Sequence, residues 1–244
     1  MRAALPLLLV LVLALAAGCG GGSSPALPVG ADPVELDPAE FVARIDNPFL
    51  PLRPGARWVY RETDGEGAEQ RVTVTVLERT KTILGIEATV VHDVVTAAGR
   101  VVEDTEDWYA QDERGNVWYL GEDTKEYRGG EVVSTAGSWQ AGVDGAQAGV
   151  VMPADPRVGL AYRQEYYEGE AEDAGEVLSL DERVVVPYGA FDGVLLTKDW
   201  TPLDPDAEER KSYARGVGLV LAVPVGGGGR EELLRFTGGR PAGS

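Results

Sequence analysis

The sequence predicts an all-β domain, mainly antiparallel, in which a meandering curved sheet forms a barrel or a half-barrel. Three observations favour it: segments in which apolar and polar residues alternate, turn signals at roughly ten-residue spacing, and only one short segment with a helical pattern. A β-sandwich is the alternative architecture. No repeat of fixed period covers the chain, which disfavours a propeller or a solenoid.

The one expected helix is short and spans residues 37–44. Asp37 is a suitable N-cap, Pro38 suits the first helical position, and the residues Phe41, Val42 and Ile45 give it an apolar side. The segment Asn47-Pro48 ends it, because a residue before proline disfavours the helical conformation.

The rest of the domain is expected to consist of strands and turns. Residues 71–78 show the alternation clearly, because Val72, Val74 and Val76 share one face. The expected strands are 57–63, 71–78, 86–95, 101–107, 108–111, 117–120, 125–128, 131–134, 160–169, 176–186, 190–200, 208–214, 217–223 and 231–236. Residues 135–159 are expected to form a long loop, a natural lid over a cavity.

The N-terminus predicts export. Arg2 precedes an apolar run from Leu5 to Ala17, and small residues follow, as in a secretory signal. The run of 13 residues is too short for a bilayer core, which needs roughly 20 helical residues. We therefore expect a signal peptide at 1–18, a flexible Gly-, Ser- and Pro-rich tether at 19–37, one β-rich domain at 38–237, and a disordered tail at 238–244.

The residues from Leu15 to Cys19 resemble the bacterial lipobox, in which a small residue precedes a cysteine that receives diacylglycerol. Ala16 stands where the motif usually has leucine, and Cys19 is the only cysteine in the chain, so it cannot form an internal disulfide. The resemblance implies a lipoprotein of the cell envelope, outside the cytoplasm and anchored to a membrane by acyl chains such as palmitate on Cys19. An ordinary signal peptide cut near the same place is the alternative.

Two later stretches, residues 186–194 and 213–220, resemble the closing part of many uncharacterised secreted bacterial proteins. In that group a "P-x-G-x-F-x-x-V" strand pair precedes a "Y-A-x-G-V-G-L-V" hairpin, and a hairpin like residues 107–119 occurs earlier. The resemblance implies a curved-sheet lipoprotein architecture of the kind that carries lipids or lipoproteins through the envelope. It transfers no catalytic residues, because its motifs belong to turns and packing.

Composition excludes several functions. The net charge is −18, and removal of the signal leaves 40 acidic and 21 basic residues, so nucleic acid is not an expected partner. The single histidine, His92, excludes zinc sites that need two. We expect His92 to be a buried, hydrogen-bonded core residue, with Asp93 on the opposite face of the strand. No G-x-S-x-G motif and no other catalytic set is present, so we lean towards a protein that is not an enzyme.

Two groups are candidates for a site. The chain has more aromatic residues than one core accounts for: adjacent Trp118 and Tyr119 cannot both face the same side of a strand, although packing across the sheet is the simpler interpretation. The candidate ligand-binding residues are Trp108, Trp118, Tyr119, Trp139, Tyr166 and Tyr167. The candidate metal ligands, for calcium, are Glu168, Glu170, Glu172 and Asp173, although a solvated turn would have the same composition.

Together these features predict a non-enzymatic envelope lipoprotein whose curved sheet binds an apolar ligand or an envelope partner. A calcium-dependent glycan binder and a carboxylate-based hydrolase are the alternatives. The expected partners are therefore the membrane, through the acylated cysteine, and a lipid, a glycan or an envelope protein. No cofactor is expected under the first interpretation, and calcium belongs to the alternative of a calcium-dependent glycan binder.

Overall fold

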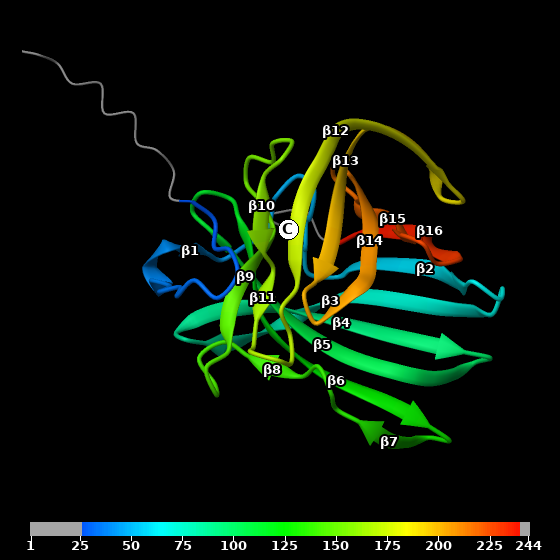
Figure 1. Cartoon of the computed structure of the whole chain (residues 1–244), viewed down its shortest axis with the longest axis horizontal. Coiled ribbons are helices and arrows are strands. Elements are labelled where there is room, and N and C mark those ends of the chain that lie inside the picture. The colour runs from blue at the N-terminus through cyan, green and yellow to red at the C-terminus, as the bar shows by residue number, and fades with distance from the viewer. Residues whose placement is uncertain (1–25, 240–244) are drawn as a thin grey trace, which may run out of the picture.

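In a computed structural model, which describes residues 26–239, antiparallel strands form a sheet that curls into a nearly closed barrel (Figure 1). The predicted fold class is therefore confirmed. Signal peptide, Cys19 and all but two residues of the tail lie outside the described residues. No helix between residues 26 and 239 is long and apolar enough to span a membrane.

Most strands of the sheet pair with the next strand along the chain, and the last strand, β16, pairs with β2. The strand order is β10-β12-β13-β14-β15-β16-β2-β3-β4-β5-β6-β9-β11, while β1 pairs with β5, and β7 and β8 pair with β6. The strands are β1 (Phe41–Val42), β2 (Ala56–Asp64), β3 (Glu69–Ile83), β4 (Ile86–Ala97), β5 (Arg100–Asp112), β6 (Val117–Arg128), β7 (Glu131–Ser134), β8 (Trp139–Gln140), β9 (Gln147–Met152), β10 (Ala161–Arg163), β11 (Glu165–Tyr166), β12 (Ala174–Val186), β13 (Gly189–Thr201), β14 (Asp204–Ala214), β15 (Gly218–Pro224) and β16 (Gly229–Gly238).

The expected helix is shortened to a single 3-10 turn, Pro38–Glu40. Asp37 does cap it, because its side chain accepts a hydrogen bond from the Ala39 amide at 2.9 Å. The prediction of a helix as far as residue 44 is wrong, because Phe41 and Val42 form β1 and pair with the end of β5. Strand pairing outcompetes the weak helical pattern here, since a helix of two turns has little stability of its own.

Residues 135–159 are not a free loop. They contain β8 and β9, and β9 joins β6 to form part of the barrel wall. The expected break within residues 117–128 is a bulge in one continuous strand, at Gly121. A Cβ atom there would lie 2.3 Å from the Trp139 carbonyl oxygen, so only glycine lets β8 approach this closely.

The consecutive strands β10 and β11 close the barrel, because they pair with opposite ends of the sheet. β10 pairs with β12 and β11 pairs with β9, and only Gln164 separates β10 from β11. The two ends of the sheet therefore meet at residues 161–166. The backbones approach closely here: a Cβ atom on Gly149 would lie 2.4 Å from the backbone carbon of Gln164.

The N-terminal residues lie along this closure. Arg163 is buried, and its guanidinium donates hydrogen bonds to the carbonyl oxygens of Gly30 at 2.8 Å, Asp32 at 2.7 Å and Ala148 at 2.9 Å. Its backbone amide donates to the Pro28 carbonyl at 2.7 Å. We call residues 28–34 the strap. The predicted boundary between tether and domain at residue 37 stays a prediction.

Candidate functional site

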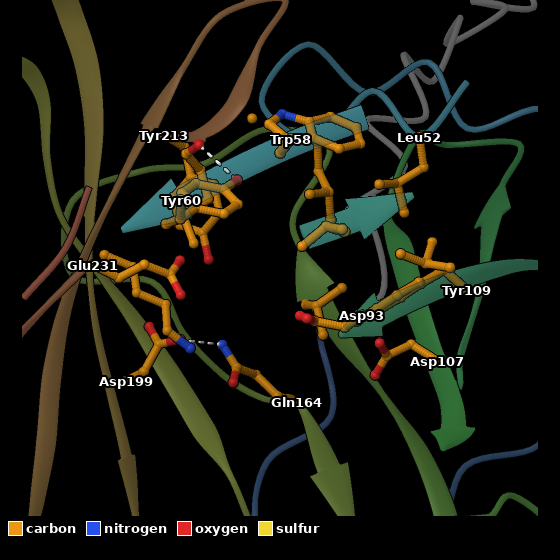
Figure 2. Close-up of a pocket in the computed structure, with 17 residues that line it drawn as sticks. Leu52, Trp58, Tyr60, Asp93, Asp107, Tyr109, Gln164, Asp199, Tyr213 and Glu231 are labelled. Carbon is orange, nitrogen blue, oxygen red and sulfur yellow. Dashed lines mark hydrogen bonds and ion pairs between the residues drawn. The ribbon is translucent and has the colours of Figure 1, made fainter. Parts of the chain in front are cut away.

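A cavity of about 220 Å³ lies inside the barrel (Figure 2), and we call it the inner cavity. Strands from both halves of the sheet line it, and the segment before β2 contributes two leucines. Its lining residues are Leu50, Leu52, Trp58, Tyr60, Val74, Val91, Asp93, Asp107, Tyr109, Val151, Gln164, Asp199, Lys211, Tyr213, Gly218, Leu219 and Glu231. Four carboxyl groups and one ammonium group therefore share a small space with four aromatic rings.

A second hollow of about 460 Å³ adjoins it, and we call it the mouth groove. Asp93 and Glu231 line both hollows, so the two adjoin at these side chains. The mouth groove adds Glu62, Glu103 and Glu126, and Arg128 is its one cationic lining residue. The acidic lining thus extends from the interior to the open end of the barrel.

Strand alternation brings the acidic residues to the interior. On β4, Asp93 shares a face with Val91 and Val95, and Val91 pairs with Asp107 of β5. On β16, Glu231 is two residues from buried Leu233, which pairs with the inward-facing Tyr60. Successive side chains of a strand point to opposite faces, so carboxyl groups at these positions must share the face of the apolar core.

Burial changes the ionisation of these carboxyl groups. Desolvation, followed by the charges of Asp107 and Glu231, raises the pKa of Asp93 to about 8. Desolvation and then Glu62 and Glu209 raise the pKa of Glu231 to about 7. For Asp107 the pKa is raised to about 6 by desolvation, against a hydrogen bond that the Tyr119 hydroxyl donates at 2.7 Å.

The lysine in the inner cavity already has a counter-ion. Lys211 Nζ lies 3.1 Å from Asp199 Oδ2 and 3.6 Å from Glu209 Oε2. Desolvation lowers the pKa of Lys211, but these carboxylates raise it more, so the net pKa is well above its usual value. Asp199 also accepts a hydrogen bond from Gln164 at 3.0 Å and one from Thr197 at 2.8 Å.

A further pair of carboxyl groups lies beside the inner cavity. Desolvation and then Asp107 raise the pKa of Glu122 to about 8, and desolvation and then Asp173 raise the pKa of Glu165 to about 8. The Oε2 atom of Glu165 is buried without a hydrogen-bond partner among the described residues. The interior therefore holds more carboxyl groups than its single lysine could balance if all of them were ionised.

The six aromatic residues predicted as ligand contacts lie outside the lining of the inner cavity. Trp118 and Tyr119 have different neighbours, although both are buried in the hydrophobic core. Trp118 packs edge-on against Phe41 and donates a hydrogen bond to Asp112 at 3.0 Å, whereas Tyr119 stacks on Tyr109 with centroids 4.9 Å apart.

The other four are placed separately. Trp139 is buried edge-on against Tyr119, and Trp108 is buried under Lys81. Tyr166 lies beside the Arg163 guanidinium, and Tyr167 closes the turn before β12. Their role in ligand binding stays a prediction.

The acidic cluster predicted for calcium lies in the turn between β11 and β12. Glu168, Glu170 and Asp173 are exposed, and Glu172 accepts a hydrogen bond from the Gly169 amide at 2.8 Å. Between residues 26 and 239, no group of three or more His, Cys, Asp and Glu side chains is arranged to hold a metal ion. Calcium binding in this turn stays a prediction.

The predicted burial of His92 in the core is wrong, whereas its predicted hydrogen bond is present. Its side chain is 32% exposed on the outer face of the sheet, where Nε2 lies 3.1 Å from Asp104 Oδ1. Its neighbour Asp93 faces the interior instead. Val90 and Val91 are both buried, so both faces of β4 are covered at this point of the strand and apolar alternation does not identify the inner face.

No protein-family model and no curated protein matches the chain. Solved structures that match include an exported protein with a YmcC-like fold from Bacteroides fragilis NCTC 9343, at 15% identity and a TM-score of 0.42. A protein described as a lipoprotein, from Parabacteroides distasonis ATCC 8503, matches at 13% identity and a TM-score of 0.40. Each match covers 78% of this chain and 98% of the other. Both similarities are too low to bear on function.

Proposed function

We propose that this chain is a cell-envelope lipoprotein, lipidated on Cys19, that binds a small molecule in the inner cavity of its barrel. The inner cavity carries the proposal, because it combines apolar and aromatic walls with a few convergent polar groups, as ligand sites usually do. The sequence before Cys19 supports the location, since it has the features of an export signal that ends at the only cysteine.

The volume limits the size of the ligand. At about 30 Å³ for each water molecule, 220 Å³ holds roughly seven waters, so a small metabolite fits and a whole phospholipid does not. The leucines Leu50, Leu52 and Leu219 and the valines around them offer contacts to an apolar portion of the ligand. Its polar portion would meet Asp93, Asp107 and Glu231.

The lining favours binding over catalysis. It contains no serine, cysteine or histidine that could serve as a nucleophile or as its base. A carboxylate-based hydrolase is the second candidate, because Asp93 and Asp107 lie on neighbouring strands with raised pKa values. Turnover of a glycoside that is lost in Asp107→Asn would favour this second candidate.

Ligand binding is tested by obstructing the inner cavity. Val74 lines the cavity and is only half-buried, so the larger side chain of Val74→Phe should occupy the ligand's space. Thr75→Phe is the matched control, because the neighbouring side chain points to the outer face and is equally half-buried. Native mass spectrometry of the protein, purified without detergent from cells that express the full chain, should show a small bound mass in wild type and in Thr75→Phe only. A wild-type protein without bound mass, and with no added mass on incubation with a metabolite extract, would contradict the proposal.

The anchor has an independent test. Cells that express the full chain should incorporate labelled palmitate into the protein, and Cys19→Ser should abolish both the label and its membrane association. The Cys19→Ser protein should then appear folded in the soluble fraction. Its retention in the membrane fraction without a label would show that lipidation of Cys19 is not the anchor.

A further inference from the structure

The carboxyl groups of the inner cavity face one another across an open space. Figure 2 shows Glu231 reaching in from one side and Asp93 from the other, with Asp107 and Asp199 below and Tyr60 and Tyr213 above. Glu231 and Asp93 come from β16 and β4, which lie on different parts of the barrel wall. The fold therefore brings together carboxyl groups that are 138 residues apart in the sequence.

Two of these carboxyl groups have no partner in the protein. The Oδ1 atom of Asp93 is buried without a hydrogen bond. The side chain of Glu231 is half-buried, and it makes no hydrogen bond and no ion pair with any residue from 26 to 239. Asp199 and Asp107, in contrast, are engaged by Lys211 and by the Tyr119 hydroxyl. Unpaired buried carboxylates are costly, and they are normally compensated by a cation or by a proton.

The aromatic rings beside them are available for contact with a ligand. Trp58 Nε1 donates to the Val217 carbonyl at 2.7 Å, and the Tyr60 hydroxyl donates to the Leu219 carbonyl at 3.0 Å. Since the backbone satisfies these polar atoms, the ring carbons form the wall of the inner cavity. Aromatic rings next to carboxylates are the surroundings in which proteins hold organic ammonium groups.

We infer that the ligand of the inner cavity is a small organic cation, held through its ammonium group between Asp93 and Glu231. This inference rests on the proposed function and specifies its ligand. A bare metal ion is a poorer fit, because no group of three or more potential ligands is arranged for one among residues 26–239. In the mouth groove, Glu62, Glu103 and Glu126 extend the negative lining outwards and would attract a cation towards the interior.

The inference implies that binding displaces protons. The groups that act on Asp93 are Asp107 and Glu103 from β5, Glu231 from β16 and Glu62 from β2, and all of them disfavour its ionisation. Glu62 and Glu209 act on Glu231 in the same direction, and Lys211 acts against them. A bound cation stabilises both carboxylates, so its binding should release protons at neutral pH. Binding should be weaker at pH 5, because both groups are then more fully protonated.

The test compares a cation with a neutral molecule of the same shape. Choline and 3,3-dimethyl-1-butanol differ chiefly in the charge of the central atom, and spermidine serves as a second cationic probe. The full chain is washed at pH 5 and high salt to remove a resident cation, and it is then titrated calorimetrically at pH 7.5 in two buffers of different ionisation enthalpy. We expect a cationic probe to bind with proton release to the buffer, and the neutral alcohol to bind at least tenfold more weakly.

Variants locate the binding. Glu231→Gln and Asp93→Asn preserve shape, and each should weaken binding of the cationic probe about tenfold or more, whereas Glu66→Gln on an exposed turn should not change it. Either variant suffices if the other does not fold. Equal binding of choline and the neutral alcohol, unaffected by both variants, would contradict the inference that the ligand is a cation. The proposal that the inner cavity binds a small molecule would still stand. If no probe binds and no bound mass is found in the wild type, both proposals fail.

Discussion

Replacing Asp93 by asparagine should stabilise the fold, and the gain should grow as the pH rises. The side chain keeps its shape, but it can no longer ionise. In the wild type, desolvation and the neighbouring Asp107 and Glu231 raise the pKa of Asp93 from 3.8 to about 8 in the folded state. The folded state therefore holds a proton that the unfolded chain loses above pH 4, so the stability associated with this group falls as the pH rises from about 4 to about 8 and levels off above that.

Between the two pKa values, each pH unit above the unfolded-state pKa contributes about 1.4 kcal/mol to the effect. Relative to the wild type, Asp93→Asn should gain about 1.5 kcal/mol at pH 5 and about 4 kcal/mol at pH 7 from ionisation alone. Urea unfolding followed by tryptophan fluorescence at pH 5, 7 and 8.5 measures this gain. Guanidinium is avoided because it is itself an organic cation. Glu66→Gln, at an exposed position, is the control. A difference in unfolding free energy between Asp93→Asn and wild type that does not vary with pH would refute the reasoning.

Three further substitutions test other parts of the fold by urea unfolding. Gly149→Ala should destabilise the barrel by about 2–3 kcal/mol, because its Cβ would lie 2.4 Å from the backbone of Gln164. Gly189→Ala is the control, because its Cβ meets open space and the change should be neutral. Equal effects of the two substitutions would contradict the close approach of the backbones at the closure. Arg163→Met should cost about 2–4 kcal/mol and expose the strap to proteolysis, since it leaves two strap carbonyls without donors; an uncleaved strap would argue against this role. Tyr119→Phe should cost about 1–2 kcal/mol near pH 8 and raise the pKa of Asp107 above 6, measurable from its carboxyl chemical shift, and an unchanged pKa would mean that the hydroxyl does not stabilise the carboxylate.

The fold class could be predicted because the alternation of apolar and polar residues within each strand is visible in its own short segment of sequence. The alternation of Val72, Val74 and Val76 identified β3, and the turn at residues 98–100 identified the hairpin of β4 and β5. What the sequence could not supply was which strand closes the barrel. The change of partners at Gln164 depends on the pairing of β10 with β12 and of β11 with β9, and no motif marks these pairings.

The inner cavity was missed for a similar reason. Its acidic residues lie on four different strands, and no two of them have a spacing typical of a known site. One local signal was available: Asp93 and Glu231 share a strand face with buried valine or leucine two residues away. A carboxyl group on the apolar face of a strand costs free energy, and such a position indicates a polar interior. The surplus of aromatic residues was a weaker guide to the site, because Trp108 and Trp118 pack outside the lining of the inner cavity.

If Cys19 is lipidated as proposed, the strap would also determine which way the barrel faces relative to the membrane. β5 runs from Glu103 at the mouth groove to Asp112, which lies with the N-terminal residues at the opposite end of the molecule (Figure 1). The strap is first held at Pro28, and the nine residues from Cys19 to that point extend at most roughly 30 Å. With a lipid on Cys19, this short connection would keep the end of the barrel that carries the strap near the bilayer. The mouth groove would then open towards the surrounding aqueous compartment, so the protein would exchange its ligand with solution and not with the membrane that holds it.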